Sequence, residues 1–156
     1  MRFLALDLGD KRTGLATGDA VTRLASPLSV VELPMAGSDG GERLLDALAR
    51  IIADERPDGI VVGLPLNMDD GSEGAAAVKV RAYANRLAQR TGLPVHFQDE
   101  RLTTADADWS MAQSGLTRAQ KKARRDALAA AAILRDFLTS DQFNHRGTED
   151  TEREPV

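Results

Sequence analysis

Short apolar runs alternate with turn residues in the first third of the chain. Residues 2–9, RFLALDLG, are mostly apolar and end at the turn-forming sequence GDKR, after which residues 13–19, TGLATGD, mix apolar and polar positions. This pattern predicts a hairpin of two strands. Residues 24–33, LASPLSVVEL, predict a third strand, which Pro27 weakens at its start because proline cannot donate a ladder hydrogen bond.

Helical spacing of apolar residues begins after residue 40. It predicts a helix over residues 42–56, since Pro57 marks the end of the pattern. The apolar positions of this helix are Leu44, Leu45, Leu48, Ile51 and Ile52.

The rest of the chain alternates between predicted strands and helices. Residues 59–66, GIVVGLPL, are apolar on both faces, as in a buried parallel strand. A helix is predicted over residues 75–91, ended by Gly92, and residues 93–98 predict a fifth strand. Thr117 and Gln120 have the spacing of a capping box that opens a last helix running to about residue 138.

This order, βββαβαβα, predicts an α/β fold. The expected mixed sheet has five strands, of which the first three are antiparallel and the others are joined by parallel crossovers with helices on both faces. With 156 residues, 42% of them hydrophobic, the chain has room for one domain over residues 1–138. Residues 139–156 are polar and predict a disordered tail.

Composition excludes several classes of protein. The chain has no cysteine, so disulfides and thiolate zinc sites are excluded. No apolar stretch approaches the roughly 20 residues of a membrane span, and the first residues lack the order of a signal peptide. We therefore expect a soluble, cytoplasmic protein without a membrane partner.

Charge is unevenly distributed. Five acids against two arginines in residues 139–156 account for most of the formal charge of −4. A basic cluster precedes this segment, and phosphate binding depends on such local patches more than on total charge. In isolation, a solvated helix face is an equally good interpretation of the cluster. It consists of Arg118, Lys121, Lys122, Arg124 and Arg125.

Three acidic residues occupy positions where an acid is costly. Asp7 follows an apolar run, Glu100 ends the predicted fifth strand in QDERLTT, and Asp126 lies on the apolar face of the last helix. A carboxylate in apolar surroundings takes up a proton or finds cations, and several together could hold a divalent metal. Metal-assisted hydrolysis of a phosphodiester is therefore the leading hypothesis.

Each acid also has a structural alternative. Asp126 could form a partly buried salt bridge with Arg12 or Arg101, and Asp7 could cap a turn. Asp99 competes with Glu100 for the role of ligand, and the sequence leaves that choice open.

Several basic and polar residues are candidate substrate contacts. Guanidinium groups can grip two phosphate oxygens at once, and the loop over residues 63–74 offers side chains that can hydrogen-bond backbone oxygens. Surface solubility is the alternative for each basic residue. The candidates are Arg12, Asn67, Ser72, Arg101, Lys122 and Arg125.

Four sequence blocks together resemble the YqgF family of RuvX-like proteins, described as Holliday junction resolvases or pre-16S rRNA nucleases. The blocks are LALDLGDKRTGLA, VVGLPLNMDDGS, QDERLTTADA and KKARRDALAAAAIL, in this order over residues 3–138. The resemblance implies a ribonuclease H-like fold and an acidic triad of Asp7, Glu100 and Asp126 that binds Mg²⁺ or Mn²⁺. An acid that closes the fourth strand in many proteins of this fold is absent here, where the sequence reads GLPL.

The resemblance implies a metal-dependent nuclease that matures the 5′ end of pre-16S rRNA during ribosome biogenesis. Cleavage of four-way DNA junctions is the alternative within this class, and no residue separates RNA from DNA. DLGDKRTGLATG also resembles the phosphate loop of the actin and sugar-kinase group, which makes an ATP-binding lobe a further alternative. A catalytically silent nucleic-acid-binding module is another. The expected partner is precursor rRNA or branched DNA, and the protein could be a monomer or a homodimer.

Overall fold

Three antiparallel strands open the chain in the computed structural model, which describes residues 1–101 and 117–140. β1 (Arg2–Leu8) pairs with β2 (Thr13–Asp19), and β2 pairs with β3 (Ala25–Val31). The predicted hairpin and third strand are thus confirmed. The register of β2 and β3 shifts between Leu15 and Ala16, next to the proline expected to weaken the strand.

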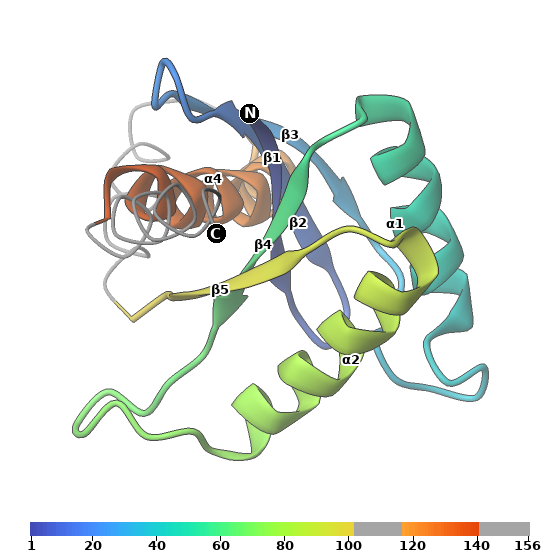
Figure 1. The fold of residues 1–156 in the computed structure, drawn as a ribbon. Helices are drawn as coiled ribbons and strands as arrows, with labels where there is room; N and C mark the ends of the chain where they lie inside the picture. The colour runs from blue at the N-terminus through green and yellow to red at the C-terminus, as the bar shows by residue number, and fades with distance from the viewer. Residues whose placement is uncertain (102–116, 141–156) are drawn as a thin grey trace, which may run out of the picture.

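Two parallel crossovers and a final helix complete the order βββαβαβα, as predicted. β4 lies parallel to β1, and β5 lies parallel to β4, so the sheet order is β3-β2-β1-β4-β5 (Figure 1). The remaining elements are α1 (Glu42–Glu55), β4 (Gly59–Leu64), α2 (Ala75–Thr91), β5 (Val95–Asp99) and α4 (Arg118–Thr139).

Local sequence signals set the helix ends. Arg56 has a left-handed φ of 52° and ends α1 one residue before the predicted boundary, because Pro57 disfavours the helical conformation in the residue before it. Gly92 ends α2 with a φ of 74°. The predicted capping box is present: Thr117 Oγ1 accepts from the Gln120 backbone N–H at 3.2 Å, and Gln120 Oε1 accepts from the Thr117 N–H at 3.1 Å.

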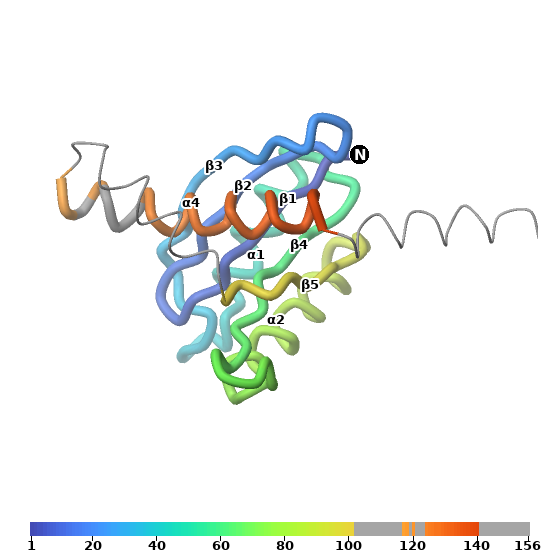
Figure 2. The backbone as a smooth tube through the Cα atoms, turned by 90° about the vertical axis from the view of Figure 1, so that its left-hand side faces the viewer, coloured from blue at the N-terminus to red at the C-terminus, as the bar shows by residue number. Residues whose placement is uncertain are grey.

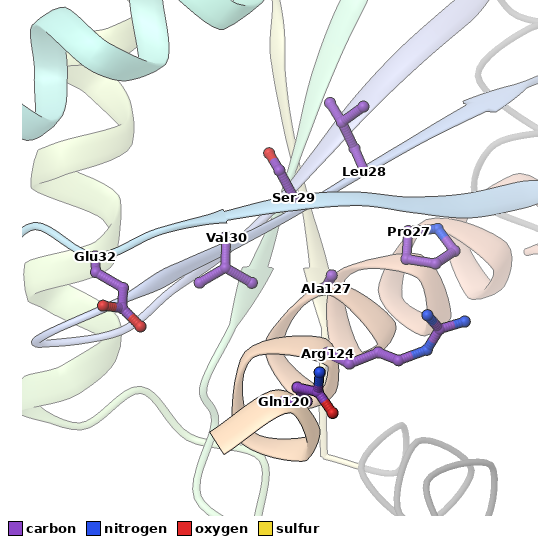
Figure 3. A pocket seen from close by; sticks show the side chains of 8 residues that line it. All are labelled: Pro27, Leu28, Ser29, Val30, Glu32, Gln120, Arg124 and Ala127. Carbon is purple, nitrogen blue, oxygen red and sulfur yellow. The ribbon is translucent and has the colours of Figure 1, made fainter. Parts of the chain in front are cut away.

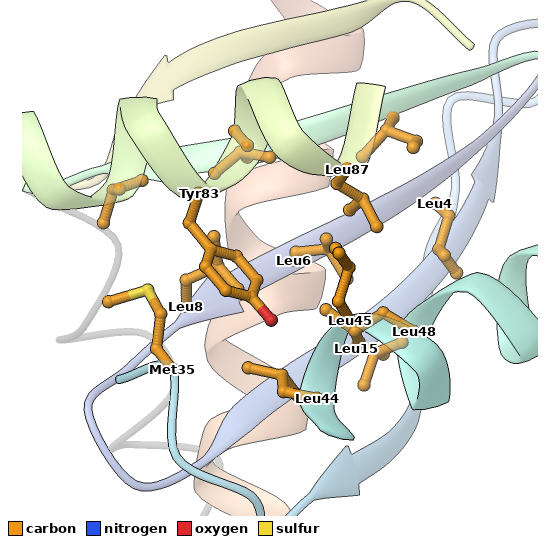
Figure 4. Packing of buried hydrophobic residues seen from close by; sticks show 14 of the residues in the cluster. Leu4, Leu6, Leu8, Leu15, Met35, Leu44, Leu45, Leu48, Tyr83 and Leu87 are labelled. Carbon is orange, nitrogen blue, oxygen red and sulfur yellow. The ribbon is translucent and has the colours of Figure 1, made fainter. Parts of the chain in front are cut away.

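The helices cover opposite faces of the sheet, and Figure 2 shows α4 running across the face away from α1 and α2. Even-numbered residues of β1, such as Leu4 and Leu6, pack in the cluster with α1 and α2 (Figure 4), whereas Phe3 and Ala5 pack in the cluster with α4. Because side chains alternate along a strand, Asp7 is on the α4 face.

The last helix lies very close to β2. A Cβ atom at Gly14 would overlap the carbonyl oxygen of Asp126, so only glycine permits this approach. Alanines make up much of the buried face of α4, including Ala127, Ala130 and Ala131. Small side chains on both elements therefore let this helix approach the strands.

Part of the predicted organisation lies outside the described residues. α4 continues to Thr139, and residues 141–156 of the predicted tail are not described. Within the described chain, none of the helices is both long and apolar enough to cross a bilayer.

Candidate active site

Asp7 lies near the C-terminal end of β1. It pairs with Gly14 of β2, and the backbone of α4 at Asp126 covers that glycine. The pairing register therefore brings two of the three predicted acids, Asp7 and Asp126, to the same place on the α4 face.

Glu100 follows directly after β5. Its N–H donates to the carbonyl of Leu64 at 3.4 Å, which extends the pairing of β5 with β4 by one residue. A Cβ atom at Gly63 would lie 2.6 Å from Glu100 Oε2 and 2.5 Å from Ile133 Cδ1. The Glu100 carboxyl group thus occupies the space that a side chain at Gly63 would fill. It lies on the sheet face that also carries Asp7.

Asp7 and Glu100 share a hydrogen bond. Burial, followed by the negative charge of Asp126, raises the pKa of Asp7 from 3.8 to about 6. Burial, followed by the charge of Asp7, raises the pKa of Glu100 from 4.5 to about 8. Protonated Glu100 therefore donates to Asp7 near neutral pH, and the shared proton relieves the repulsion between two crowded carboxylates.

Asp126 forms the third corner of the site. Arg12 Nε lies 3.0 Å from Asp126 Oδ2, so the salt bridge weighed as an alternative from the sequence is present. Both side chains are partly buried. The contact lacks hydrogen-bond geometry, and the buried Oδ2 accepts no hydrogen bond from the described residues. An oxygen left in this state retains a lone pair for another ligand.

The donor set fits a hard divalent cation. All three acids offer oxygen ligands, which suit Mg²⁺ or Mn²⁺. Over residues 1–101 and 117–140, no three acidic or histidine side chains already converge as a metal-binding cluster. A proton between Asp7 and Glu100 and the guanidinium of Arg12 at Asp126 supply the positive charge instead.

Asp99, the rival of Glu100, is engaged elsewhere. Its carboxylate accepts hydrogen bonds from the Arg101 Nε at 2.8 and 3.1 Å, and these lower the pKa of Asp99. The structure thus brings Glu100, and not Asp99, to Asp7.

The predicted phosphate contacts lie in different surroundings. Arg12 contacts Asp126, and Arg101 is held by Asp99. Arg125 is exposed on α4, and Lys122 lies on the same helix with a side chain outside the description. Arg12 therefore lies next to the carboxylates.

The loop between β4 and α2 is held by its own hydrogen bonds. The Asn67 amide donates to Ser72 Oγ at 2.8 Å, so these two predicted substrate contacts bind each other. Arg101 Nη1 donates to the Asn67 carbonyl at 3.5 Å, and its guanidinium lies 3.1 Å from where a Cβ of Gly71 would be. Arg101 therefore fastens the loop to the end of β5, a role that the sequence analysis missed.

A cavity gives access to Glu100 from the α2 side. Its volume is about 310 Å³, and its lining includes Gly9, Asp10 and Lys79. Lys79 Nζ lies 3.5 Å from Asp10 Oδ1, and both side chains are exposed. Glu100 therefore borders this cavity as well as packing against Gly63.

Fold and site together define a ribonuclease H-like nuclease. The mixed sheet carries an acid near the end of β1, a second after β5 and a third on the helix that covers them. The family model described as "RuvX: Holliday junction resolvase" matches residues 1–140. The chain belongs to this family, a family of nucleases.

Curated relatives extend over almost the same length. A protein of Anaeromyxobacter sp. (strain Fw109-5) is 46% identical over 138 residues, which is 88% of this chain and 96% of the relative. A protein of Lactococcus lactis subsp. cremoris (strain MG1363) is 39% identical over 137 residues, covering 88% and 93%. Both carry the name "Putative pre-16S rRNA nuclease".

Solved structures support the fold. RuvC of T. thermophilus in complex with a Holliday junction substrate has a TM-score of 0.58 at 18% identity, covering 95% of this chain and 96% of that one. Fowlpox virus resolvase in complex with Holliday junction DNA has a TM-score of 0.55 at 10% identity, covering 90% and 100%. At these identities the similarity shows the ribonuclease H-like fold alone.

Proposed function

We propose that this protein is a divalent-metal-dependent nuclease that processes the 5′ end of pre-16S rRNA. The observation that carries the metal dependence is the pair Asp7 and Glu100, whose carboxyl groups are crowded enough to share a proton. Such a pair is stabilised when a cation replaces the proton. Membership of a nuclease family supports the reaction class.

The three acids are the residues that would hold Mg²⁺ or Mn²⁺. A bound ion of this kind lowers the pKa of water and stabilises charge on phosphate oxygens. Asp7 and Glu100 would hold the ion as carboxylates once their shared proton has left, and Asp126 would offer its unsatisfied Oδ2. Arg12 already lies beside Asp126, so its guanidinium can neutralise a non-bridging phosphate oxygen at the same site.

The proposed substrate rests on the relatives. Curated proteins that match nearly their whole length share the name of a pre-16S rRNA nuclease. Four-way DNA is the second candidate, because the matching family model is described as a Holliday junction resolvase. In either case the partner is nucleic acid, and precursor rRNA would place the enzyme in the cytoplasm.

One assay tests both parts. Cleavage of a pre-16S 5′ fragment and of a synthetic four-way junction is measured side by side with Mg²⁺, with Mn²⁺ and with EDTA. Asp7→Asn is the test variant, and Asp54→Asn, at an exposed position of α1, is the matched control. We expect precursor rRNA to be cleaved only with metal, with at least a hundredfold loss in Asp7→Asn and no loss in the control.

Two results would contradict the proposal. Cleavage that persists in EDTA would exclude metal dependence. Equal cleavage by Asp7→Asn and the wild type would mean that the carboxyl pair is not the active site. Cleavage of the junction with no cleavage of precursor rRNA would keep the site and move the substrate to branched DNA.

A further inference from the structure

A groove runs between the edge strand β3 and the first half of α4 (Figure 3). Its volume is about 530 Å³. Val30 pairs with Gly14 and Pro27 pairs with Ala16, and both partners face α4, so Val30 and Pro27 face α4 as well. The β3–α4 groove is lined by Pro27, Leu28, Ser29, Val30, Glu32, Gln120, Arg124 and Ala127.

The β3–α4 groove lies close to the carboxylate site, and α4 packs on Gly14 between them. Asp7, Gly14 and Val30 form one row across β1, β2 and β3. Neighbouring strands are about 4.8 Å apart, so Val30 lies about 10 Å from Asp7.

Arg124 gives the groove an available positive charge. No described residue forms a hydrogen bond or an ion pair with its guanidinium, in contrast to Arg12 and Arg101, which each contact a carboxylate. Glu32 is the one acid among the described lining residues, and Figure 3 shows it at the other end of the groove from Pro27 and Arg124. The charges therefore favour an anionic group at the Arg124 end.

The other lining groups suit a nucleotide. Pro27, Val30 and Ala127 form an apolar wall against which a sugar or a base can pack. Gln120 Oε1 accepts from the Thr117 N–H, which leaves the amide NH₂ of Gln120 to donate to a ligand. β3 has a neighbour on one side only, so backbone groups on its outer side can also bind.

We propose that the β3–α4 groove binds the substrate strand to one side of the scissile phosphodiester, an assignment that rests on the nuclease function proposed above. Arg124 contacts a backbone phosphate, and the apolar wall contacts an adjoining sugar or base. The occupant is a nucleic-acid strand and not a second copy of the chain, because the exposed guanidinium, which no described residue engages, and the short distance to the acids both favour a phosphate backbone.

The test measures binding separately from cleavage. Binding of a pre-16S 5′ fragment is measured with Ca²⁺ at several salt concentrations for the wild type, Arg124→Gln and Arg50→Gln. Arg50 is exposed on α1, across the sheet, so its variant makes the same change of charge away from the groove. Val30→Phe fills the groove without a change of charge, and thermal melting checks that each variant folds.

We expect Arg124→Gln to lower the slope of log K against log salt by about 0.7 to 0.9, the value for one lost phosphate contact. Val30→Phe should weaken binding by at least fivefold with the slope retained. Arg50→Gln should match the wild type. Arg124→Gln with the wild-type slope, or folded Val30→Phe with wild-type binding, would overturn the groove assignment.

Three further outcomes separate the possible failures. If the free wild type sediments as a dimer that Val30→Phe dissociates, a second copy occupies the groove and the assignment is wrong. If the groove variants weaken binding but no metal supports cleavage, the groove stands and the nuclease function fails. If cleavage is normal in the wild type and in Arg124→Gln alike, the groove fails and the nuclease stands.

Discussion

Replacing Glu100 with Gln should remove a pH dependence from the stability of the metal-free protein. The pKa of Glu100 is raised from 4.5 to about 8, so the folded state holds this proton more tightly than the unfolded state. The stabilisation is complete below pH 4.5 and is lost as the pH rises through about 8. Asp7, whose pKa is raised from 3.8 to about 6, contributes in the same direction over a lower interval.

The size of the effect follows from the difference between the raised pKa of Glu100 and its ordinary value. The full difference in the pKa of Glu100 corresponds to at most about 5 kcal/mol. Glu100 is only partly buried and shares its proton with Asp7, so about half of that value or less, roughly 2 kcal/mol, is expected.

Denaturant unfolding in EDTA at pH 5 and pH 9 measures the effect. The wild type should lose roughly 2 kcal/mol more than Glu100→Gln between these pH values, because glutamine cannot titrate. Asp54→Asn, on the exposed side of α1, serves as the control and should follow the wild type. Parallel pH profiles for the wild type and Glu100→Gln would refute the shared proton.

Three other changes test the packing and positioning around the site. Gly63→Ala places a methyl group 2.5 Å from Ile133 Cδ1 and 2.6 Å from Glu100 Oε2. Thermal melting should therefore show a loss of about 1–3 kcal/mol of stability, and cleavage should fall at least tenfold. Cleavage at the wild-type rate would contradict the placement of the Glu100 carboxyl group. Arg101→Ala should speed limited proteolysis of the loop between β4 and α2, and Arg101→Lys should restore part of the protection; an equal cutting rate in all forms would show that the loop holds itself. Tyr83→Phe removes a buried hydrogen bond of 2.7 Å to a backbone carbonyl, so it should cost about 1 kcal/mol in unfolding with cleavage unchanged.

The spacing of apolar residues predicts most of the helices and strands, because helices cover both faces of the sheet and each element therefore buries apolar side chains. Helical spacing over α1, the capping box of Thr117 and the apolar run of β4 each depend on neighbours in sequence, and all three are confirmed. The end of α1 differs by one residue because the proline effect acts on the residue before it.

The candidate site likewise combines features that the sequence predicts with features that only the tertiary structure shows. Burial of Asp7 can be read from the apolar run before it, and the structure has this residue buried on the α4 face. Whether Asp99 or Glu100 lies beside Asp7 depends on which of the two side chains points toward Gly63. The pairing of β5 with β4 decides this, and the sequence alone does not give that pairing. Glycine inside a predicted strand was the available signal, because it marks a close approach of another group.

Salt bridges were the least predictable part. The contacts of Arg12 with Asp126 and of Arg101 with the loop join segments far apart in the sequence, so no local pattern distinguishes them from phosphate contacts. The groove beside Arg124 was missed because it forms only when β3 and α4 lie side by side.

Calorimetric titration with Mn²⁺ at pH 7, in two buffers with different heats of ionisation, tests the central claim that Asp7 and Glu100 exchange a shared proton for a divalent cation. The wild type should release up to about one proton for each ion bound, because the pKa of Glu100 is about 8. Glu100→Gln should release fewer protons, and Asp7→Asn should lose the binding site. Mn²⁺ binding without proton release, or equal binding by Asp7→Asn and the wild type, would contradict this account of the active site.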